Sequence, residues 1–243
     1  MVEGLYSAAS GMAAQEQQLD AIGNDLANQS SSGYKSERIG FSDLLYNQVN
    51  LTGTHSDVGA GARAQEIGRD ESEGSVQQTG NPLDLAIEGE GFFQVKLSNG
   101  STALTRNGTF GVDANGQITD AEGNFLQPPI KLPAGATPSE VQISTDGTVS
   151  LGGRKLGQIG LVTVPAPEHL LDSGGGLLTP TSSSGAPQAQ SASKIQQGAL
   201  ESSNVDVASE MAKMISTQRS YQLASSAIQT ESQMMSIANQ LRS

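Results

Sequence analysis

The sequence predicts an α+β protein in which paired, coiled-coil-like N- and C-terminal helices flank a central all-β domain of meander or barrel-like form. Neither Gly nor Pro occurs between Val207 and Leu241, so nothing interrupts a helix there. Apolar residues recur every seven positions in both terminal segments. Asn-Gly pairs recur in the middle of the chain, where they indicate hairpin turns between short strands.

The C-terminal segment predicts a helix of roughly 50 Å at 1.5 Å per residue. Ser203, Asn204 and Asp206 precede it and offer oxygens for an N-cap. Its apolar stripe is thin, and an isolated helix draws most of its stability from a packed apolar face, so this helix needs a partner. The residues expected on that face are Val207, Met211, Met214, Tyr221, Ile228 and Met235.

The N-terminal segment, residues 3–28, predicts the partner helix. Leu5, Met12, Leu19 and Leu26 recur every seven residues, which suggests that the two terminal helices fold together. Few charges occur on the C-terminal helix, and small neutral side chains on its other faces favour contacts on several sides, as in an assembly. An ordinary surface helix pair in a monomer explains the periodicity equally well.

The chain divides into three predicted regions. Residues 1–46 comprise the N-terminal helix and a loop, and they pair with the C-terminal helix region 196–243. Residues 47–75 are polar and Gly-rich and predict an extended linker. Residues 76–195 predict the β-rich domain. Within the first region, Phe41 to Tyr46 is interpreted as a further helical turn or a docking segment.

Turn signals organise the predicted β domain. Asn-Gly pairs at 99–100, 107–108 and 115–116 are eight residues apart, which leaves strands of about six residues and predicts a β-meander. A final strand is expected over 155–164, stopped by Pro165. The low-complexity stretch 173–193 predicts a loop that returns toward the helices.

Composition limits the possible functions. The net charge is −12 and the 13 basic residues are scattered, which argues against nucleic acid and against an anionic membrane surface as partners. With no Cys and two His, a metal site is not expected, and no cofactor is expected either. The sequence contains no run of 18 apolar residues, so no membrane-spanning helix is predicted. The first basic residue is Lys35, so no Sec-type signal is predicted.

Catalysis is not predicted. Glu88 and Glu90 flank Gly89, and paired carboxylates are what a glycosidase requires. Most acidic residues of the middle region, however, lie next to turn glycines, where Asp and Asn serve turn geometry. No G-x-S-x-G motif occurs. A cell-wall hydrolase remains an alternative that an activity assay of a Glu88/Glu90 double variant would test.

Three blocks of the sequence resemble the bacterial flagellar axial proteins, the rod and hook subunits. The stretch IGNDLANQSSSGYKSER resembles their N-terminal signature, and NPLDLAIEGEGFFQV resembles their central region. GALESSNVDV resembles the block before their final helix. Gly23 and Asp25 depart mildly from the family pattern. The matching signature residues are Asn24, Ala27, Asn28, Gly33, Tyr34 and Lys35 at the N-terminus, with Ser203, Asn204, Val205 and Asp206 near the C-terminus.

This resemblance implies a structural subunit of the flagellar basal-body rod, which polymerises into a helical tube and transmits torque from motor to hook. Its partners would be further copies of itself, other rod and hook proteins and the flagellar export apparatus. Its location would be the periplasm-spanning basal body, reached without a cleaved signal peptide. Distal and proximal rod types both remain open. The alternatives are a hook-type axial subunit and a soluble β-rich surface or adhesive protein with a helical stalk.

Overall fold

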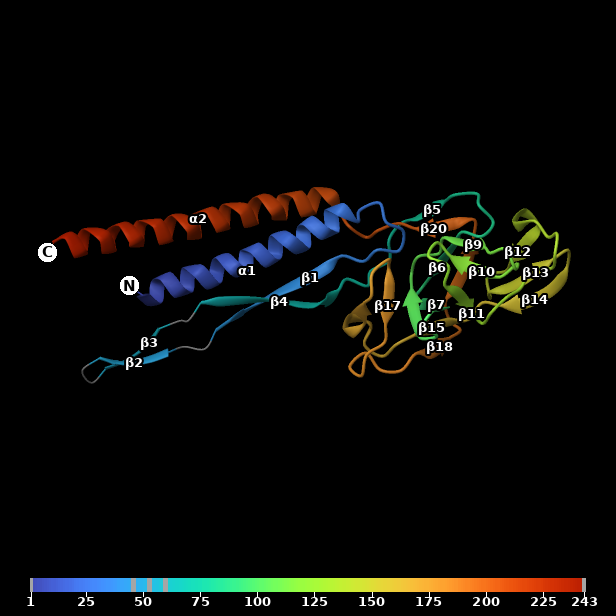
Figure 1. The fold of residues 1–243 in the computed structure, drawn as a ribbon, viewed down its shortest axis with the longest axis horizontal. Helices are drawn as coiled ribbons and strands as arrows, with labels where there is room; N and C mark the ends of the chain where they lie inside the picture. Colours follow the sequence, from blue (N-terminus) through green and yellow to red (C-terminus); the bar gives the residue numbers. More distant parts are fainter. Residues whose placement is uncertain (1, 45–46, 52–53, 59–60, 242–243) are drawn as a thin grey trace. The chain divides into compact units, whose positions relative to one another are not determined.

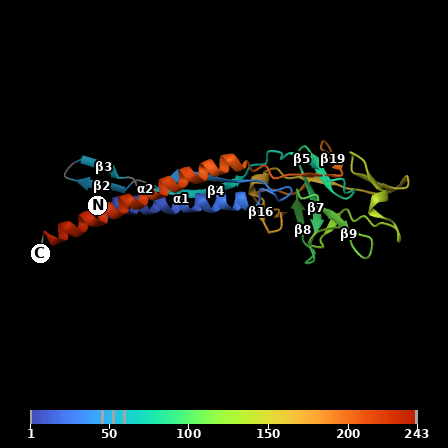
Figure 2. The same cartoon turned by 90° about the horizontal axis from the view of Figure 1, so that it is seen from above.

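The computed structural model describes residues 2–44, 47–51, 54–58 and 61–241. The fold is α+β, with one long helix near each terminus and a β-rich middle (Figures 1 and 2). The chain forms two compact units. Unit 1 comprises Met1–Ala27, Glu37–Arg69 and Asp206–Ser243, and unit 2 comprises Asn28–Ser36 and Asp70–Val205.

Unit 1 contains the two long helices, α1 (Val2–Ala27) and α2 (Val207–Gln240). They lie side by side and run in opposite directions (Figure 1). A Cβ built on Gly4 would lie 3.1 Å from the Glu231 carboxylate, so the first turn of α1 meets the C-terminal half of α2. Asp206 caps α2, because its Oδ1 accepts a hydrogen bond from Ala208 N at 3.1 Å. The expected helices are therefore present to within a residue or two.

A β-hairpin completes unit 1. β1 (Glu37–Asp43) pairs antiparallel with β4 (Ala62–Arg69), and β2 (Asn47–Leu51) pairs with β3 (Thr54–Val58). α1 packs against both β1 and β4.

The hairpin corrects two predictions. Residues 41–43 lie in a strand and not in a helical turn, while Tyr46 lies outside the described residues. Paired strands also occupy much of the segment 47–69 that was expected as an extended linker. Cross-strand hydrogen bonds and the contact of β4 with α1 stabilise these strands. They do not pack into a two-sided core, so their sequence lacks the alternating apolar residues that would have predicted them.

Unit 2 is built around a nine-stranded sheet with β7 (Phe92–Lys96) inside it. Its main path runs β16-β17-β8-β7-β11-β10-β9, and β15 pairs with both β7 and β18. Because β7 bonds to three strands, the sheet is branched and is not a simple meander. The other strands are β8 (Thr102–Thr105), β9 (Phe110–Val112), β10 (Ile118–Asp120), β11 (Phe125–Gln127), β15 (Leu161–Thr163), β16 (Leu171–Asp172), β17 (Leu177–Thr179) and β18 (Gln188–Gln190).

Three small sheets complete unit 2. β12 (Val141–Ile143), β13 (Thr148–Leu151) and β14 (Arg154–Gln158) form one antiparallel sheet. In the second, β6 (Leu85–Glu88) pairs with β19 (Lys194–Gln197), and in the third β5 (Val76–Gln78) pairs with β20 (Ala199–Glu201). Short 3₁₀ turns, η1 (Pro138–Glu140) and η2 (Pro167–His169), lie between strands. The last two sheets join residues more than 100 positions apart, which ties the end of unit 2 to its beginning.

Two of the three Asn-Gly pairs form the hairpin turns that were expected. Gly100 and Gly116 have φ of 85° and 82° and link β7 to β8 and β9 to β10. The middle pair does not form a turn of this kind. A Cβ on Gly108 would lie 1.6 Å from the Leu85 carbonyl oxygen, so this glycine is required by a close backbone approach.

Two further predictions on the β region need correction. The single strand expected over 155–164 is two strands, β14 and β15, which belong to different sheets. The loop expected over 173–193 contains β17 and β18. Strands of two or three residues carry too little periodicity for the sequence pattern to reveal them.

The core of unit 2 is aliphatic around two aromatic rings. Phe93 and Phe110 meet edge to face with centroids 5.2 Å apart. Ile195 on β19 belongs to the same core and is 2% exposed. The predicted boundary at residue 195 therefore falls within a strand that the core requires.

Truncating Ile195 tests this role of β19. We expect Ile195→Ala to lower the free energy of unfolding by about 2–4 kcal/mol, because it leaves a cavity in a closed core. Leu171→Ala, at a position on β16 that is 61% exposed, should change it by less than about 0.5 kcal/mol. Denaturant unfolding followed by the β-sheet circular dichroism band measures both, and equal losses would show that β19 is peripheral.

Candidate assembly interface and the buried Glu201 clamp

A buried carboxylate organises one end of unit 2. Glu201, the last residue of β20, is 2% exposed. Its Oε1 accepts hydrogen bonds from Lys35 Nζ at 2.6 Å and from Gly74 N at 3.0 Å. Its Oε2 lies 3.1 Å from Arg106 Nε. We refer to Lys35, Arg106, Glu201 and Asn204 as the Glu201 clamp.

The signature loop after α1 enters the clamp through its backbone as well. Gly33 N donates to the Glu201 carbonyl at 2.8 Å. Gly33 has φ of 70°, and a Cβ there would lie 2.5 Å from the Arg106 carbonyl carbon. Both the conformation and the close approach exclude a side chain, which explains why glycine occupies this position. Lys35 Nζ then reaches the Ser72 carbonyl at 2.6 Å.

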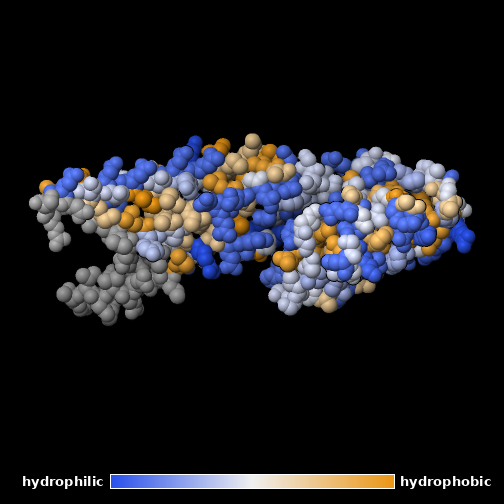
Figure 3. Space-filling view, viewed as in Figure 1, coloured by the Kyte–Doolittle hydropathy of each residue, from blue (hydrophilic) through white to orange (hydrophobic). Residues whose placement is uncertain are grey.

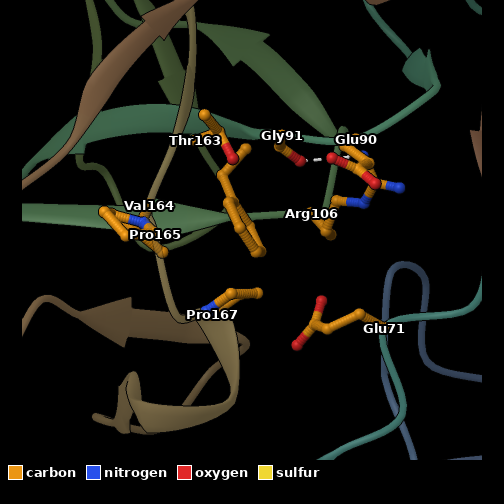
Figure 4. Close-up of a pocket in the computed structure, with 9 residues that line it drawn as sticks. Glu71, Glu90, Gly91, Arg106, Thr163, Val164, Pro165 and Pro167 are labelled. Carbon is orange, nitrogen blue, oxygen red and sulfur yellow. Dashed lines mark hydrogen bonds between the residues drawn. The ribbon is translucent and has the colours of Figure 1, made fainter. Parts of the chain in front are cut away.

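Arg106 joins the clamp to the start of β7. Its Nη1 donates to the carbonyls of Gly89 and Gly91 at 2.9 and 2.8 Å, and Figure 4 marks the bond to Gly91. Two cations therefore surround one carboxylate, and three backbone carbonyls accept further hydrogen bonds from these cations. Such pairing is what a charge needs when it is buried.

Asn204 holds the other half of the motif in place. Its Oδ1 accepts from Ser36 N at 2.9 Å and its Nδ2 donates to the Asp70 carbonyl at 2.7 Å. Its backbone N donates to the Tyr34 carbonyl at 3.4 Å. The two sequence motifs thus meet in unit 2, although nearly 170 residues separate them.

The remaining motif positions have local roles. Asn24 donates to Glu37, Asn28 accepts from Ser31, Ser203 accepts from Val205 N, Ala27 is exposed and Val205 is half-buried.

The predicted apolar stripe of α1 is half-buried rather than buried. Leu5, Met12, Leu19 and Leu26 each keep part of their surface exposed. The deepest positions on this helix are instead Ala14, Ala21, Ile22 and Asp25. Because α1 contacts both α2 and the hairpin, its buried surface is broader than a two-helix stripe and small residues fill it.

On α2 the residues facing the rest of unit 1 are partly polar. Val207, Met214, Ile228 and Met235 are half-buried, while Tyr221 is at the limit of exposure at 36%. The most buried side chains of the helix are Glu210 and Thr217, three residues after Val207 and Met214. Met211, which was expected on this stripe, is 55% exposed.

Large apolar side chains also lie on the surface of α2. Spacings of three, four, eight and eleven residues place them on one face of a 3.6-residue helix, within an arc of about 140°. The opposite face carries Met214 and Ile228. Figure 3 shows apolar surface exposed over both helices. We call these residues the outer stripe of α2: Met211, Ile215, Leu223, Met234, Ile237 and, just after the helix, Leu241.

Carboxylates gather where α1, α2 and the hairpin meet. Asp25, Glu37 and Glu210 line a cavity of about 290 Å³, together with Arg38 and Lys213. Burial raises the pKa of Glu37, and the charges of Glu66 and Asp25 raise it further. The hydrogen bond from Asn24 and the charge of Arg69 act in the opposite direction. Lys213 pairs with Glu210 at 2.7 Å.

Within the part of the chain that the structure describes, no group of three or more Asp, Glu, His or Cys is arranged to hold a metal ion. No helix there is both long and apolar enough to cross a membrane. Glu90 lines a cavity with Glu71 and Arg106, but Glu88 is not part of that lining and lies opposite Lys194 in the β6–β19 pair. The Glu88/Glu90 pair that the alternative of a cell-wall hydrolase requires is therefore not brought together across this cavity.

Comparisons with known proteins match these same regions. Residues 5–35 match the family model described as flagella basal body rod protein, and residues 86–151 match the D1 domain of the flagellar hook protein FlgE/F/G. Residues 196–241 match the C-terminal region of the flagellar basal body rod FlgEFG proteins. Two matched segments, 5–35 and 196–241, contain most of α1, all of α2 and every residue of the Glu201 clamp except Arg106.

Comparison with full-length relatives points to the same family. The chain is 35% identical over 263 aligned positions to the flagellar basal-body rod protein FlgG of Borreliella burgdorferi, covering 100% of this chain and 99% of the relative. It is 36% identical to the protein of that name from Caulobacter vibrioides over 100% of both chains, and 33% identical to that of Bacillus subtilis over 97% of both.

The fold, the buried clamp and these matches define a flagellar axial protein. The chain belongs to the flagellar basal-body rod protein family. It is a structural subunit of the rod and not an enzyme, it is located in the flagellar basal body, and its partners are other flagellar proteins.

Replacing the buried carboxylate tests the clamp. We expect Glu201→Gln to lower the free energy of unfolding by about 3–5 kcal/mol, because it leaves two buried cations without an anion. Glu168→Gln, at an exposed position of unit 2, is the control and should change stability by less than about 0.5 kcal/mol. Denaturant unfolding measures both, and a loss below about 1 kcal/mol for Glu201→Gln would show that the charge is dispensable.

The pKa of Glu37 predicts a pH dependence for unit 1. Because the pKa of Glu37 is raised in the folded state, the folded state binds more protons than the unfolded state. The free energy of unfolding therefore falls as pH rises from the ordinary glutamate pKa of 4.5 through the folded pKa. Glu37→Gln should flatten this fall. Asn24→Ala should extend it to higher pH, because Asn24 is the hydrogen-bond donor that stabilises the charged carboxylate. Thermal unfolding across this pH range checks both, and an unchanged slope in Glu37→Gln would contradict the assignment.

Proposed function

We propose that the protein polymerises into the helical tube of the rod through its terminal helices. In this proposal α1 and α2 pair in a coiled-coil-like manner, unit 1 forms the inner layer and unit 2 the outer layer. The polymer transmits torque from motor to hook across the periplasm. The subunit reaches the site through the flagellar export apparatus without a cleaved signal peptide.

The outer stripe of α2 is the observation that supports polymerisation. Leu223 is 73% exposed, and the other members of the stripe are more than half exposed. Full burial of one such side chain stabilises an assembly by about 1.5–3 kcal/mol. A second copy of the chain is the occupant that the proposed tube supplies, and each subunit would repeat the contact.

The charge pattern of α2 supports the same proposal. Four charged residues occur between Val207 and Leu241, and among them Arg219 lies within the arc of the outer stripe. Arg is common at protein interfaces, whereas Lys and Glu are depleted there. The rest of the helix surface is Ser, Gln, Thr and Ala, which permits close approach of a neighbouring helix.

Placing a carboxylate on the outer stripe tests the proposed polymer. We expect Leu223→Glu to raise the critical concentration for polymerisation at least about 100-fold, because a charge would be buried without a partner. The β-sheet circular dichroism and melting of unit 2 should not change. Electron microscopy and sedimentation of purified protein at increasing concentration measure assembly, and motility of cells carrying the variant as their sole copy measures function.

Gln218→Glu is the matched control. It adds the same charge to α2 at an exposed position about 140° around the helix from Leu223. Polymerisation of Leu223→Glu at the parent concentration would exclude the outer stripe as a contact. A parent protein that stays monomeric at every concentration would instead favour the adhesive protein with a helical stalk.

A further inference from the structure

The three Asn-Gly pairs of unit 2 differ in ways that bear on their chemistry. An asparagine followed by glycine can lose ammonia without an enzyme, because the backbone nitrogen of the glycine attacks the side-chain carbonyl carbon of the asparagine. Glycine favours this attack, since it has no Cβ to obstruct the approach. The three pairs share this sequence, so a difference in their reactivity has to come from the structure around them.

Asn99 lies at the exposed tip of the β7–β8 hairpin. Its side-chain Oδ1 accepts hydrogen bonds from Ser101 N at 2.8 Å and from Ser101 Oγ at 2.6 Å. Attack on the side-chain carbonyl carbon turns this oxygen into an oxyanion. Two donors aimed at the atom where negative charge develops are the arrangement by which acyl-transfer sites stabilise a tetrahedral intermediate.

The backbone after Asn99 also has room to adjust. A Cβ built on Gly100 would meet no atom within 4 Å. Gly100 N donates to the Leu97 carbonyl at 2.9 Å, and this bond must open before the nitrogen can attack. Because Gly100 and its two neighbours are exposed, the bond can open without uncovering a buried side chain. The pairing of Lys96 with Thr102 keeps the strands in register meanwhile.

Asn107 lacks this freedom, because the glycine that follows it is held from both sides. Gly108 is buried, and its carbonyl accepts a hydrogen bond from Leu85 N at 3.0 Å. The Leu85 carbonyl lies so close to Gly108 that no Cβ would fit between them. A backbone rotation that brings Gly108 N onto the Asn107 side chain would break this approach, so we expect slow reaction here.

Asn115 is exposed, but its surroundings oppose the attack. Its Nδ2 donates to Asp113 Oδ2 at 3.2 Å. A carboxylate beside the reacting amide disfavours the negative charge that develops on the amide oxygen. The Gly116 carbonyl also accepts a hydrogen bond from Leu132 N at 2.7 Å, which fixes the backbone after the asparagine.

We propose that Asn99 is a site of spontaneous deamidation at which Ser101 activates the side-chain amide, and that the fold protects Asn107 and Asn115. The Gly100 nitrogen forms a bond to the side-chain carbon of Asn99, and its proton leaves with the amide nitrogen as ammonia. A five-membered succinimide results. One water then opens either carbonyl–nitrogen bond of the ring and leaves aspartate or isoaspartate. The tip of the hairpin thereby gains a carboxylate, and water is the co-reactant.

Incubation of the purified full-length protein in mildly alkaline buffer tests the ranking of the three sites. Alkaline conditions favour the reaction, because the attacking nitrogen must lose its proton. Peptide mapping by mass spectrometry should show conversion at residue 99 at least about 10-fold faster than at residues 107 and 115. In the urea-unfolded chain the three sites should react at similar rates. Conversion at residue 99 no faster than at the other two in the folded protein would overturn the proposed site.

Ser101→Ala tests the activating role, because it removes the hydroxyl donor and keeps the backbone donor. It should slow conversion of Asn99 about 3- to 10-fold in the folded protein and leave the rate in urea unchanged. Ser98→Ala, at the exposed position before Asn99, is the matched control and should leave both rates unchanged. Equal rates for the parent and Ser101→Ala in the folded protein would show that the hydroxyl does not activate the amide.

Discussion

The pairing of Glu201 with Lys35 and Arg106 is the interaction on which the rest of unit 2 depends. Glu201 lies at the end of β20, Lys35 in the loop after α1, and Arg106 after β8. One carboxylate therefore fixes three segments that are remote in sequence. A buried ion pair adds little net stability compared with apolar packing, but an unpaired buried charge is costly, so alternative arrangements of these segments are strongly disfavoured. The clamp thus contributes mainly to the specificity of the fold and less to its net stability.

Asn204 extends this constraint without charge. Its amide bonds to the backbone of Ser36 and Asp70, which lie on either side of the hairpin in the chain. The Asn204 side chain therefore links the chain segment that precedes the hairpin to the segment that follows it. The motif residues of an axial protein can therefore be explained as a structural junction, and no catalytic role is needed to account for their types.

The sequence predicted the helices because their signals are local. A stretch without Gly or Pro and a capping Asp206 suffice to place α2. It did not predict the hairpin of residues 37–69, whose strands are held by pairing and by α1 rather than by alternation. The glycine signals were ambiguous, since Gly108 marks a close backbone approach and Gly100 a turn. Short strands such as β17 depend on neighbours that no local pattern records.

The sequence also predicted only part of the candidate interface, because burial depends on contacts between distant segments. Heptad spacing predicted one stripe for Val207, Met214, Ile228 and Met235, which are half-buried, and it gave no sign that Met211 is 55% exposed. A buried Glu201 looks like any surface Glu in a sequence, and its role depends on Lys35 and Arg106 arriving from elsewhere. The heptad spacing of Val207 and Met214 did not predict the outer stripe, because the step of eight residues from Ile215 to Leu223 does not fit a heptad repeat.

The order of the two units along the chain has a consequence for biosynthesis. Unit 1 needs Asp206–Ser243 and unit 2 needs Glu201, so neither can finish folding before synthesis has reached the last fifth of the chain. At about 5–20 residues per second, a ribosome holds the earlier segments incomplete for many seconds. Contacts of such long sequence separation also slow folding after release. Such late completion of folding is compatible with the proposed export route.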